Sequence, residues 1–173
     1  MTDPRYPIGA FEPLTRPLTE EEREARIATI EGHPARVRGL VAQLDDERLN
    51  VPYRAGGWTL RQLTHHLADS HANACIRFRL ALTEDRPTIR PYDQDAWAKL
   101  PDARSAPVEG SLRALEGLHE RWTTLLRSMS EDDFGRLLHH AEIGDVSLDF
   151  MLQLYAWHCA HHEAHLAGGG AAT

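Results

Sequence analysis

The sequence has few cysteines and lacks both long apolar runs and blocks of basic residues. Its two cysteines, Cys75 and Cys159, lie in apolar helical patterns, so we expect no disulfide scaffold. No apolar run approaches the roughly 20 residues of a membrane span, and the first residues do not resemble a signal peptide, so we expect a cytoplasmic protein with no membrane partner. The net charge of -7 makes a nucleic-acid partner unexpected.

The length and hydrophobic periodicity predict one all-helical domain. The 173 residues fall within the usual size of a single domain, so we treat 1–173 as one unit. Residues 1–17 contain four prolines and no periodicity, which indicates an irregular N-terminal arm, and the glycine-rich end, 168–173, is expected to fray. Apolar residues recur at three- and four-residue spacing in four segments that we predict to be helices: 19–44, 59–83, 111–126 and 147–167.

Helix boundaries are marked by capping residues. Thr19 with Glu22, and Thr59 with Gln62, have the spacing of capping boxes, and Ser130 with Asp133 indicates a small capped turn. One proline, at position 34, falls inside the first helix, and we expect it to kink that helix or end its first part.

A long connection separates the second and third predicted helices. The segment 84–110 contains four prolines and is far longer than a usual loop, although a short helix at 93–99 is plausible. No convincing alternation of apolar and polar residues predicts strands anywhere. The expected fold is therefore a four-helix bundle with one long crossover.

Histidine is abundant, and its distribution is the first functional lead. Seven of the eleven histidines fall in the second and fourth predicted helices: His65, His66, His71, His158, His161, His162 and His165. In the fourth helix, His162 falls near the centre of the apolar stripe and His158 lies one turn earlier. That i, i+4 spacing can present two imidazoles to one metal ion. By the same periodicity His165 lies at the flank and His161 points away.

The second predicted helix offers two inward candidates. His66 falls at one edge of the apolar stripe and His65 nearly opposite it, so His66 is the better ligand. His71 also lies inside the stripe, and periodicity alone leaves it open as a ligand or as a residue lining the pocket. A lone inward histidine is more often a hydrogen-bonded core residue than a metal ligand.

The remaining histidines and the tryptophans have simpler interpretations. We interpret His119, His139 and His140 as surface or loop residues. The four tryptophans are most simply core or interface aromatics: Trp58, Trp97, Trp122 and Trp157.

Five sequence segments resemble the YfiT-like branch of the DinB superfamily. They are YPIG near the N-terminus, PYRAGGWTLRQLTHHLADSH at 52–71, RFRLALTEDRPTIRPYDQDAW at 77–97, LHERW at 118–122 and LYAWHCAHHEAHL at 154–166. The resemblance implies a four-helix bundle in up-down-down-up order and a divalent metal, zinc or nickel, held by His66, His158 and His162. It also implies a homodimer. The C-terminal GGGAAT departs from the family, whose members usually continue the last helix.

The resemblance implies a metal-dependent enzyme, with two chemistries open. Family members are described as metal-dependent hydrolases, and relatives are bacillithiol S-transferases. Three imidazoles leave coordination positions free for water or a thiol, so both chemistries fit, and we place thiol transfer first. A metal-binding module without turnover is the third alternative. Further pocket or second-layer candidates are His71, Asp69, Tyr92, Asp93, Trp97 and Glu163.

Overall fold

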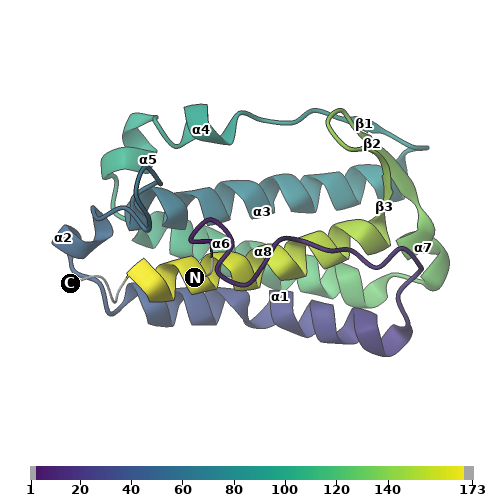
Figure 1. Ribbon diagram of the computed structural model, residues 1–173. Coiled ribbons are helices and arrows are strands. Elements are labelled where there is room, and N and C mark those ends of the chain that lie inside the picture. Colours follow the sequence, from purple (N-terminus) through teal and green to yellow (C-terminus); the bar gives the residue numbers. More distant parts are fainter. Residues whose placement is uncertain (1–2, 170–173) are drawn as a thin grey trace.

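Four long helices form the bundle in the computed structural model, which describes residues 3–169 (Figure 1). They are α1 (Glu20–Val41), α3 (Leu60–Thr83), α6 (Glu109–Ser128) and α8 (Leu148–Gly169). Helices α3 and α6 run in the same direction, and α1 and α8 run in the opposite one (Figure 1). The predicted four-helix fold and its up-down-down-up order are therefore confirmed.

The capping predictions hold, and the prediction for Pro34 is partly wrong. Thr19 and Thr59 each accept a hydrogen bond from the third residue of their helix, in complete capping boxes. Helix α1 does not end at Pro34, since it continues to Val41, three residues short of the predicted end. Pro34 is buried inside this helix and lacks the N–H that would bond to the Ile30 carbonyl.

The end of α8 is more regular than expected. Gly168 and Gly169, which we expected to fray, are still helical, while 170–173 lie outside the described residues. The helix therefore begins and ends within about two residues of its predicted limits.

The long connection crosses from the end of α3 back to the start of α6. It contains β1 (Thr88–Ile89), α4 (Gln94–Trp97) and α5 (Pro101–Ser105), and Figure 1 shows it running along α3. Two further short helices are α2 (Asp46–Leu49) and α7 (Glu131–Gly135), the latter at the predicted capped turn. This connection allows α3 and α6 to be parallel, because two parallel helices cannot be joined by a tight turn.

A small sheet at one end of the bundle contradicts the expectation of no strands. Strands β2 (Leu137–His140) and β3 (Gly144–Ser147) pair antiparallel, and β1 pairs parallel to β2. Strands of two to four residues are too short to give a period-two signal. The sheet also corrects one histidine: His140 is buried on β2, whereas His139 is exposed and bonded to Asp145 as a surface residue.

The N-terminal arm lies along α8, on the side facing away from the bundle (Figure 1). Phe11 packs edge-on against Phe150, and the carbonyl of Gly9 accepts a hydrogen bond from the Trp157 indole. Both sides of α8 are therefore covered, which explains why His161 is buried although it points away from the core. None of the described helices is long and apolar enough to cross a membrane.

Candidate metal centre

Three histidines converge between α3 and α8. The candidate ligand atoms of His66, His158 and His162 all lie within 4.8 Å of one another. The Nε2 atoms of His66 and His158 are 3.4 Å apart. Two nitrogens bound to one tetrahedral zinc ion, at bond lengths of about 2.0–2.1 Å, are separated by about 3.4 Å. The geometry of this pair therefore fits a shared ion.

Burial keeps these three rings in the neutral form that binds metal. Desolvation lowers the pKa of His66 to about 4 and lowers the pKa of His158 and of His162 well below the usual value. A neutral imidazole has one free lone pair, so no proton needs to leave before an ion binds at neutral pH.

A chain of hydrogen bonds fixes which nitrogen of His158 carries the proton. The Ile30 carbonyl can only accept, so the His119 Nδ1 atom, 2.7 Å away, must donate to it. The other nitrogen of neutral His119 then accepts from His71 Nδ1 at 2.6 Å, and His71 Nε2 accepts from His158 Nδ1 at 3.1 Å. His158 is left with its lone pair on Nε2, the atom that faces His66.

A second, shorter chain acts on His162 in the same way. The Pro4 carbonyl lies 3.1 Å from His165 Nε2, which must therefore donate. His165 Nδ1 then accepts from His162 Nδ1 at 3.4 Å, so the His162 lone pair lies on Nε2. Each chain ends on a backbone carbonyl, one in α1 and one in the N-terminal arm. Metal-binding histidines are commonly oriented in this manner by acceptors on their second nitrogen.

The other candidates from the sequence lie in three different settings. His71 contacts a candidate ligand directly, as an acceptor for His158 rather than as a third ligand. Glu163 binds His33 and Arg36 instead of any of the three rings. Asp69 is half-buried, and no hydrogen bond joins its carboxylate to a candidate ligand in residues 3–169.

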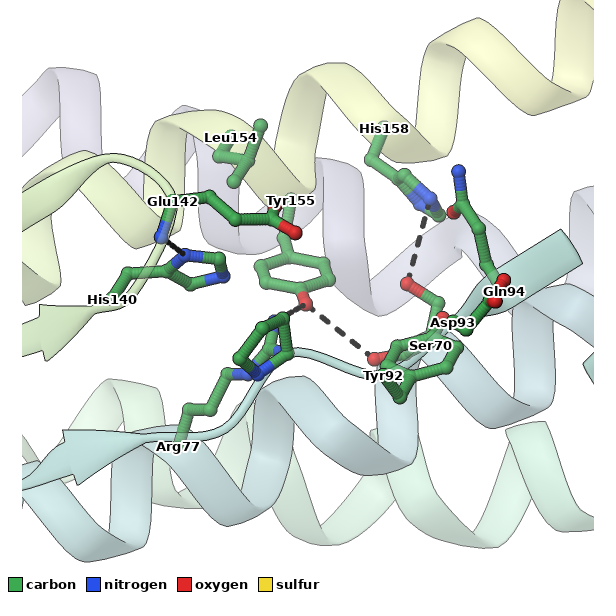
Figure 2. A pocket seen from close by; sticks show the side chains of 11 residues that line it. Ser70, Arg77, Tyr92, Asp93, Gln94, His140, Glu142, Leu154, Tyr155 and His158 are labelled. Atoms are coloured by element: carbon green, nitrogen blue, oxygen red, sulfur yellow. Dashed lines mark hydrogen bonds between the residues drawn. The ribbon is translucent and has the colours of Figure 1, made fainter. Parts of the chain in front are cut away.

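Two of the three candidates from the long connection line a pocket beside His158. Tyr92 and Asp93 are on its wall, and Trp97 lies outside it, exposed and packed against Tyr92 with the two rings tilted by 43°. The pocket has a volume of about 610 Å³ and is shown in Figure 2. Its size is in the range of small-molecule sites. The candidate metal centre therefore adjoins space for a substrate.

Several site residues were missed or misplaced by the sequence analysis. His119 is buried at the end of the chain to His158, not on the surface. His65 is also buried, because α5 and α6 cover it and supply Ser111 as a partner. The spacing Leu115, His119, Trp122 continues the apolar stripe of α6, so periodicity could have found His119. The indole of Trp58 packs on His66, a contact that no spacing indicates.

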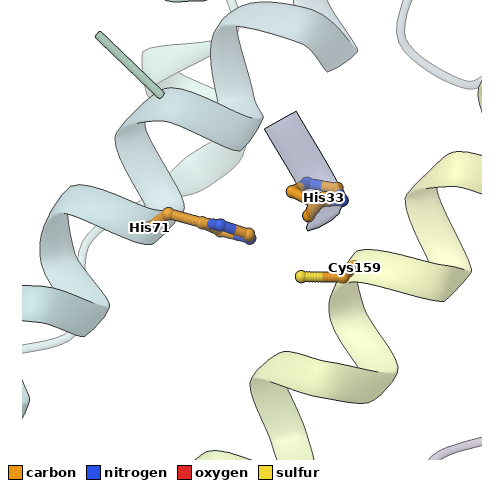
Figure 3. Close-up of side chains that lie close together, drawn as sticks. All are labelled: His33, His71 and Cys159. Carbon is orange, nitrogen blue, oxygen red and sulfur yellow. The ribbon is translucent and has the colours of Figure 1, made fainter. Parts of the chain in front are cut away.

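Two other groups of potential ligands are less suitable for a metal. His33, His71 and Cys159 point toward one another in the core (Figure 3). However, both nitrogens of His71 are already engaged, and burial raises the pKa of the Cys159 thiol well above its usual value. The other group is His161, His162 and His165. There the Nδ1 atoms of His162 and His165 are already used in the hydrogen bond between these two rings.

Comparison with known proteins identifies the family. The model of the DinB superfamily matches residues 29–166. The chain belongs to the DinB superfamily. It is 48% identical over 166 residues to proteins of Bacillus cereus and Bacillus thuringiensis that carry the name "Putative metal-dependent hydrolase", covering 96% of this chain and 95% of each relative.

A solved structure gives the same result for the fold. YfiT from Bacillus subtilis, described as "a probable metal-dependent hydrolase with an unusual four-helix bundle topology", matches with a TM-score of 0.92 and 44% sequence identity. The match covers 95% of this chain and 94% of YfiT. The resemblance to the YfiT-like branch is thereby confirmed.

Proposed function

We propose that this protein is a metal-dependent enzyme whose divalent ion, zinc or nickel, is held by His66, His158 and His162. The supporting observation is the convergence of three neutral imidazoles beside a pocket of about 610 Å³. When bound, an ion with three protein ligands keeps an open position and supplies a Lewis acid that favours deprotonation of a thiol or of water.

The reaction that we propose first is transfer of a low-molecular-weight thiol, bacillithiol, to an electrophile. No carboxylate in residues 3–169 lies within hydrogen-bonding distance of the three rings, and the groups behind His158 and His162 are neutral histidines. A site with only neutral ligands leaves the positive charge of a divalent ion uncompensated, which favours an anionic fourth ligand, thiolate or hydroxide. Addition of a thiolate to an electrophile also needs no separate general base once the thiol has lost its proton.

Hydrolysis is the second candidate, and the names of the relatives favour it. Breaking an ester or amide also requires a group that protonates the leaving atom. One hydroxyl beside the candidate metal centre is Ser70 Oγ, 3.5 Å from His158 Nε2. Tyr92 lines the same pocket, and burial raises the pKa of its phenol to about 12, which suits a hydrogen-bond donor better than a base.

The protein's own residues have distinct roles in either reaction. The three imidazoles bind the ion, and the two hydrogen-bonded chains orient the rings of His158 and His162. Tyr92 and Asp93 bring the long connection over the pocket, so they shield the reacting groups from part of the solvent. A small thiol and an electrophile are the partners that this proposal requires, and we expect the chain to act as a homodimer.

The two reactions are distinguished by an assay with and without thiol. Protein loaded with zinc or nickel is mixed with bacillithiol and a fluorogenic electrophile, and conjugation is measured beside the cleavage of ester and amide substrates. Thiol-dependent conjugation that is lost in His66→Ala supports the transferase. Cleavage of the ester or amide substrates without thiol would instead support hydrolysis and contradict thiol transfer.

A matched variant controls for nonspecific effects of losing a histidine. His139 is exposed and lies on the small sheet, so His139→Ala should keep full activity and metal content. If the metal only raises the melting temperature and neither activity is found, both enzymatic proposals are wrong and the protein is a metal-stabilised module.

A further inference from the structure

One arginine in the pocket is buried without an acidic partner. Arg77, on α3, is only 9% exposed, and its one hydrogen bond within residues 3–169 is a donation of 3.2 Å to the Tyr155 hydroxyl. Within the same residues, no carboxylate lies within ion-pair distance of it. An arginine guanidinium stays charged in proteins, and buried charges are normally paired because desolvation is costly.

The unpaired charge faces the pocket rather than the core. Arg77 is part of the pocket wall, and Figure 2 shows its side chain ending beside the Tyr155 hydroxyl. The guanidinium has five N–H groups, of which the Tyr155 hydroxyl takes one. Its positive charge also reaches His140 in the same wall, where burial first and Arg77 second lower the pKa of the imidazole. Glu142 in the same wall opposes this effect on His140, so what this end of the pocket offers a ligand is the set of buried N–H donors of Arg77.

The arginine is linked to the candidate metal centre through two residues of the pocket wall. The Tyr155 hydroxyl accepts from Arg77 at 3.2 Å and donates to the Ser70 carbonyl at 3.5 Å, and Ser70 Oγ lies 3.5 Å from His158 Nε2. A small molecule could therefore contact Arg77 and the metal centre at once within the pocket of about 610 Å³. The two carboxylates of the wall, Asp93 and Glu142, belong to exposed residues, so acidic groups line the outer part of the pocket.

From this arrangement we propose that Arg77 binds a carboxylate group of the molecule that reacts at the metal centre. The planar guanidinium matches a carboxylate with two parallel hydrogen bonds. A carboxylate fits better than a dianionic phosphate, because there is one arginine and because Asp93 and Glu142 repel additional negative charge at the entrance. The substrate class is thus a thiol or electrophile that carries a carboxylate. This inference rests on the proposed function for the reacting end only.

Binding of simple probes to the metal-free protein tests the anion site by itself. Octanoate and octanol have similar length and differ in charge, and their affinities can be measured by isothermal titration calorimetry. A charge-assisted hydrogen bond contributes about 1.5–3 kcal/mol, so octanoate should bind roughly 10- to 100-fold more tightly than octanol. In Arg77→Met this preference should disappear, and in Arg77→Lys it should be reduced.

Cobalt-loaded protein tests the reacting end with the matching thiols. Absorption from a cobalt–thiolate bond reports binding of 8-mercaptooctanol and 8-mercaptooctanoate, and the second should bind more tightly only while Arg77 is present. If octanoate prefers the wild type but neither thiol gives the absorption, the anion site stands and the thiol reaction fails.

Control variants separate the charge from the fold. Arg113→Met removes an exposed arginine from α6 and should change no affinity. Tyr155→Phe removes the partner of Arg77 and keeps its charge, so the preference for octanoate should persist. Equal binding of octanoate to wild type and to a folded Arg77→Met protein would overturn the inference. It would also be overturned if Arg77→Met weakened octanol binding as much as octanoate binding.

Discussion

Replacing His119 by leucine tests the hydrogen-bonded chain behind His158. The imidazole of His119 donates to the Ile30 carbonyl at 2.7 Å and accepts from His71 at 2.6 Å, so leucine removes both bonds. His71 is then free to place its proton on the nitrogen that faces His158. That tautomer moves the His158 proton to Nε2, the atom required for metal binding, and affinity falls.

The expected magnitude follows from comparable outer partners of metal ligands. Loss of such a partner typically costs 10- to 100-fold in metal affinity, which corresponds to about 1.4–2.8 kcal/mol. The metal-free protein should also be less stable, because a buried carbonyl without a donor costs about 1–3 kcal/mol. The two effects are separate and need separate measurements.

Glutamine at position 119 is the matched control. Its amide N–H can donate to the Ile30 carbonyl while its carbonyl accepts from His71, so His119→Gln keeps the order of donor and acceptor that leucine abolishes. Zinc affinity is measured by competition with a chromophoric chelator, and stability of the metal-free protein by urea unfolding. We expect glutamine to restore most of the zinc affinity that leucine loses.

A definite result refutes the reasoning about the chain. If folded His119→Leu binds zinc as tightly as the wild type, the chain does not set the His158 tautomer. If leucine and glutamine weaken zinc binding equally, packing around His119 matters and the direction of its hydrogen bonds does not.

Three further predictions concern the ligands, acid stability and a buried ion pair. His162→Ala should lower zinc affinity more than the loss of an outer partner does, while His139→Ala should leave it unchanged in the same chelator assay. Burial lowers the pKa of His119 from 6.5, its value in the unfolded chain, to about 3 in the fold. Below pH 6.5 the unfolded chain therefore binds a proton that the folded protein does not, and the free energy of unfolding decreases as the pH falls. At pH 4 this loss is about 3 kcal/mol, and urea midpoints of metal-free His119→Gln should fall less steeply between pH 7 and pH 4. Asp149 bonds to Arg23 at 2.8 and 2.9 Å in the core, so Asp149→Ala should cost about 3–5 kcal/mol in urea unfolding and the double variant Arg23→Met, Asp149→Leu clearly less.

Helical periodicity placed two of the three candidate ligands, His158 and His162, on one face of a helix, and it left the third open between His66 and His71. His158 and His162 are one turn apart in the apolar stripe of α8, and His66 falls at the edge of the stripe of α3. Convergence of the three rings therefore requires only that the two helices face each other. Because periodicity alone gave no reason to prefer His66 over His71, that choice came from the family resemblance, and the structure gives the physical difference: both nitrogens of His71 are used in other bonds.

Residues covered by irregular segments were the least predictable. His161 was expected to point away from the apolar stripe, and by helical phase it does, but the N-terminal arm covers it. His65 is covered by the long connection in the same way. Neither segment has a period from which its path could be inferred, and the paths are set by contacts far apart in sequence, such as Pro4 with His165.

The proline in α1 connects a local defect of the helix to the candidate metal centre. In a regular helix the Ile30 carbonyl would accept from the N–H of residue 34, and Pro34 has none. The freed carbonyl lies inside the bundle, where it must find another donor, and it finds His119. From His119 onward the donor and the acceptor of each hydrogen bond are determined, and the last bond leaves the His158 lone pair on Nε2. The proline that the sequence presents as a kink or break in a helix thus frees, in the fold, the carbonyl at which the chain that orients a candidate ligand ends.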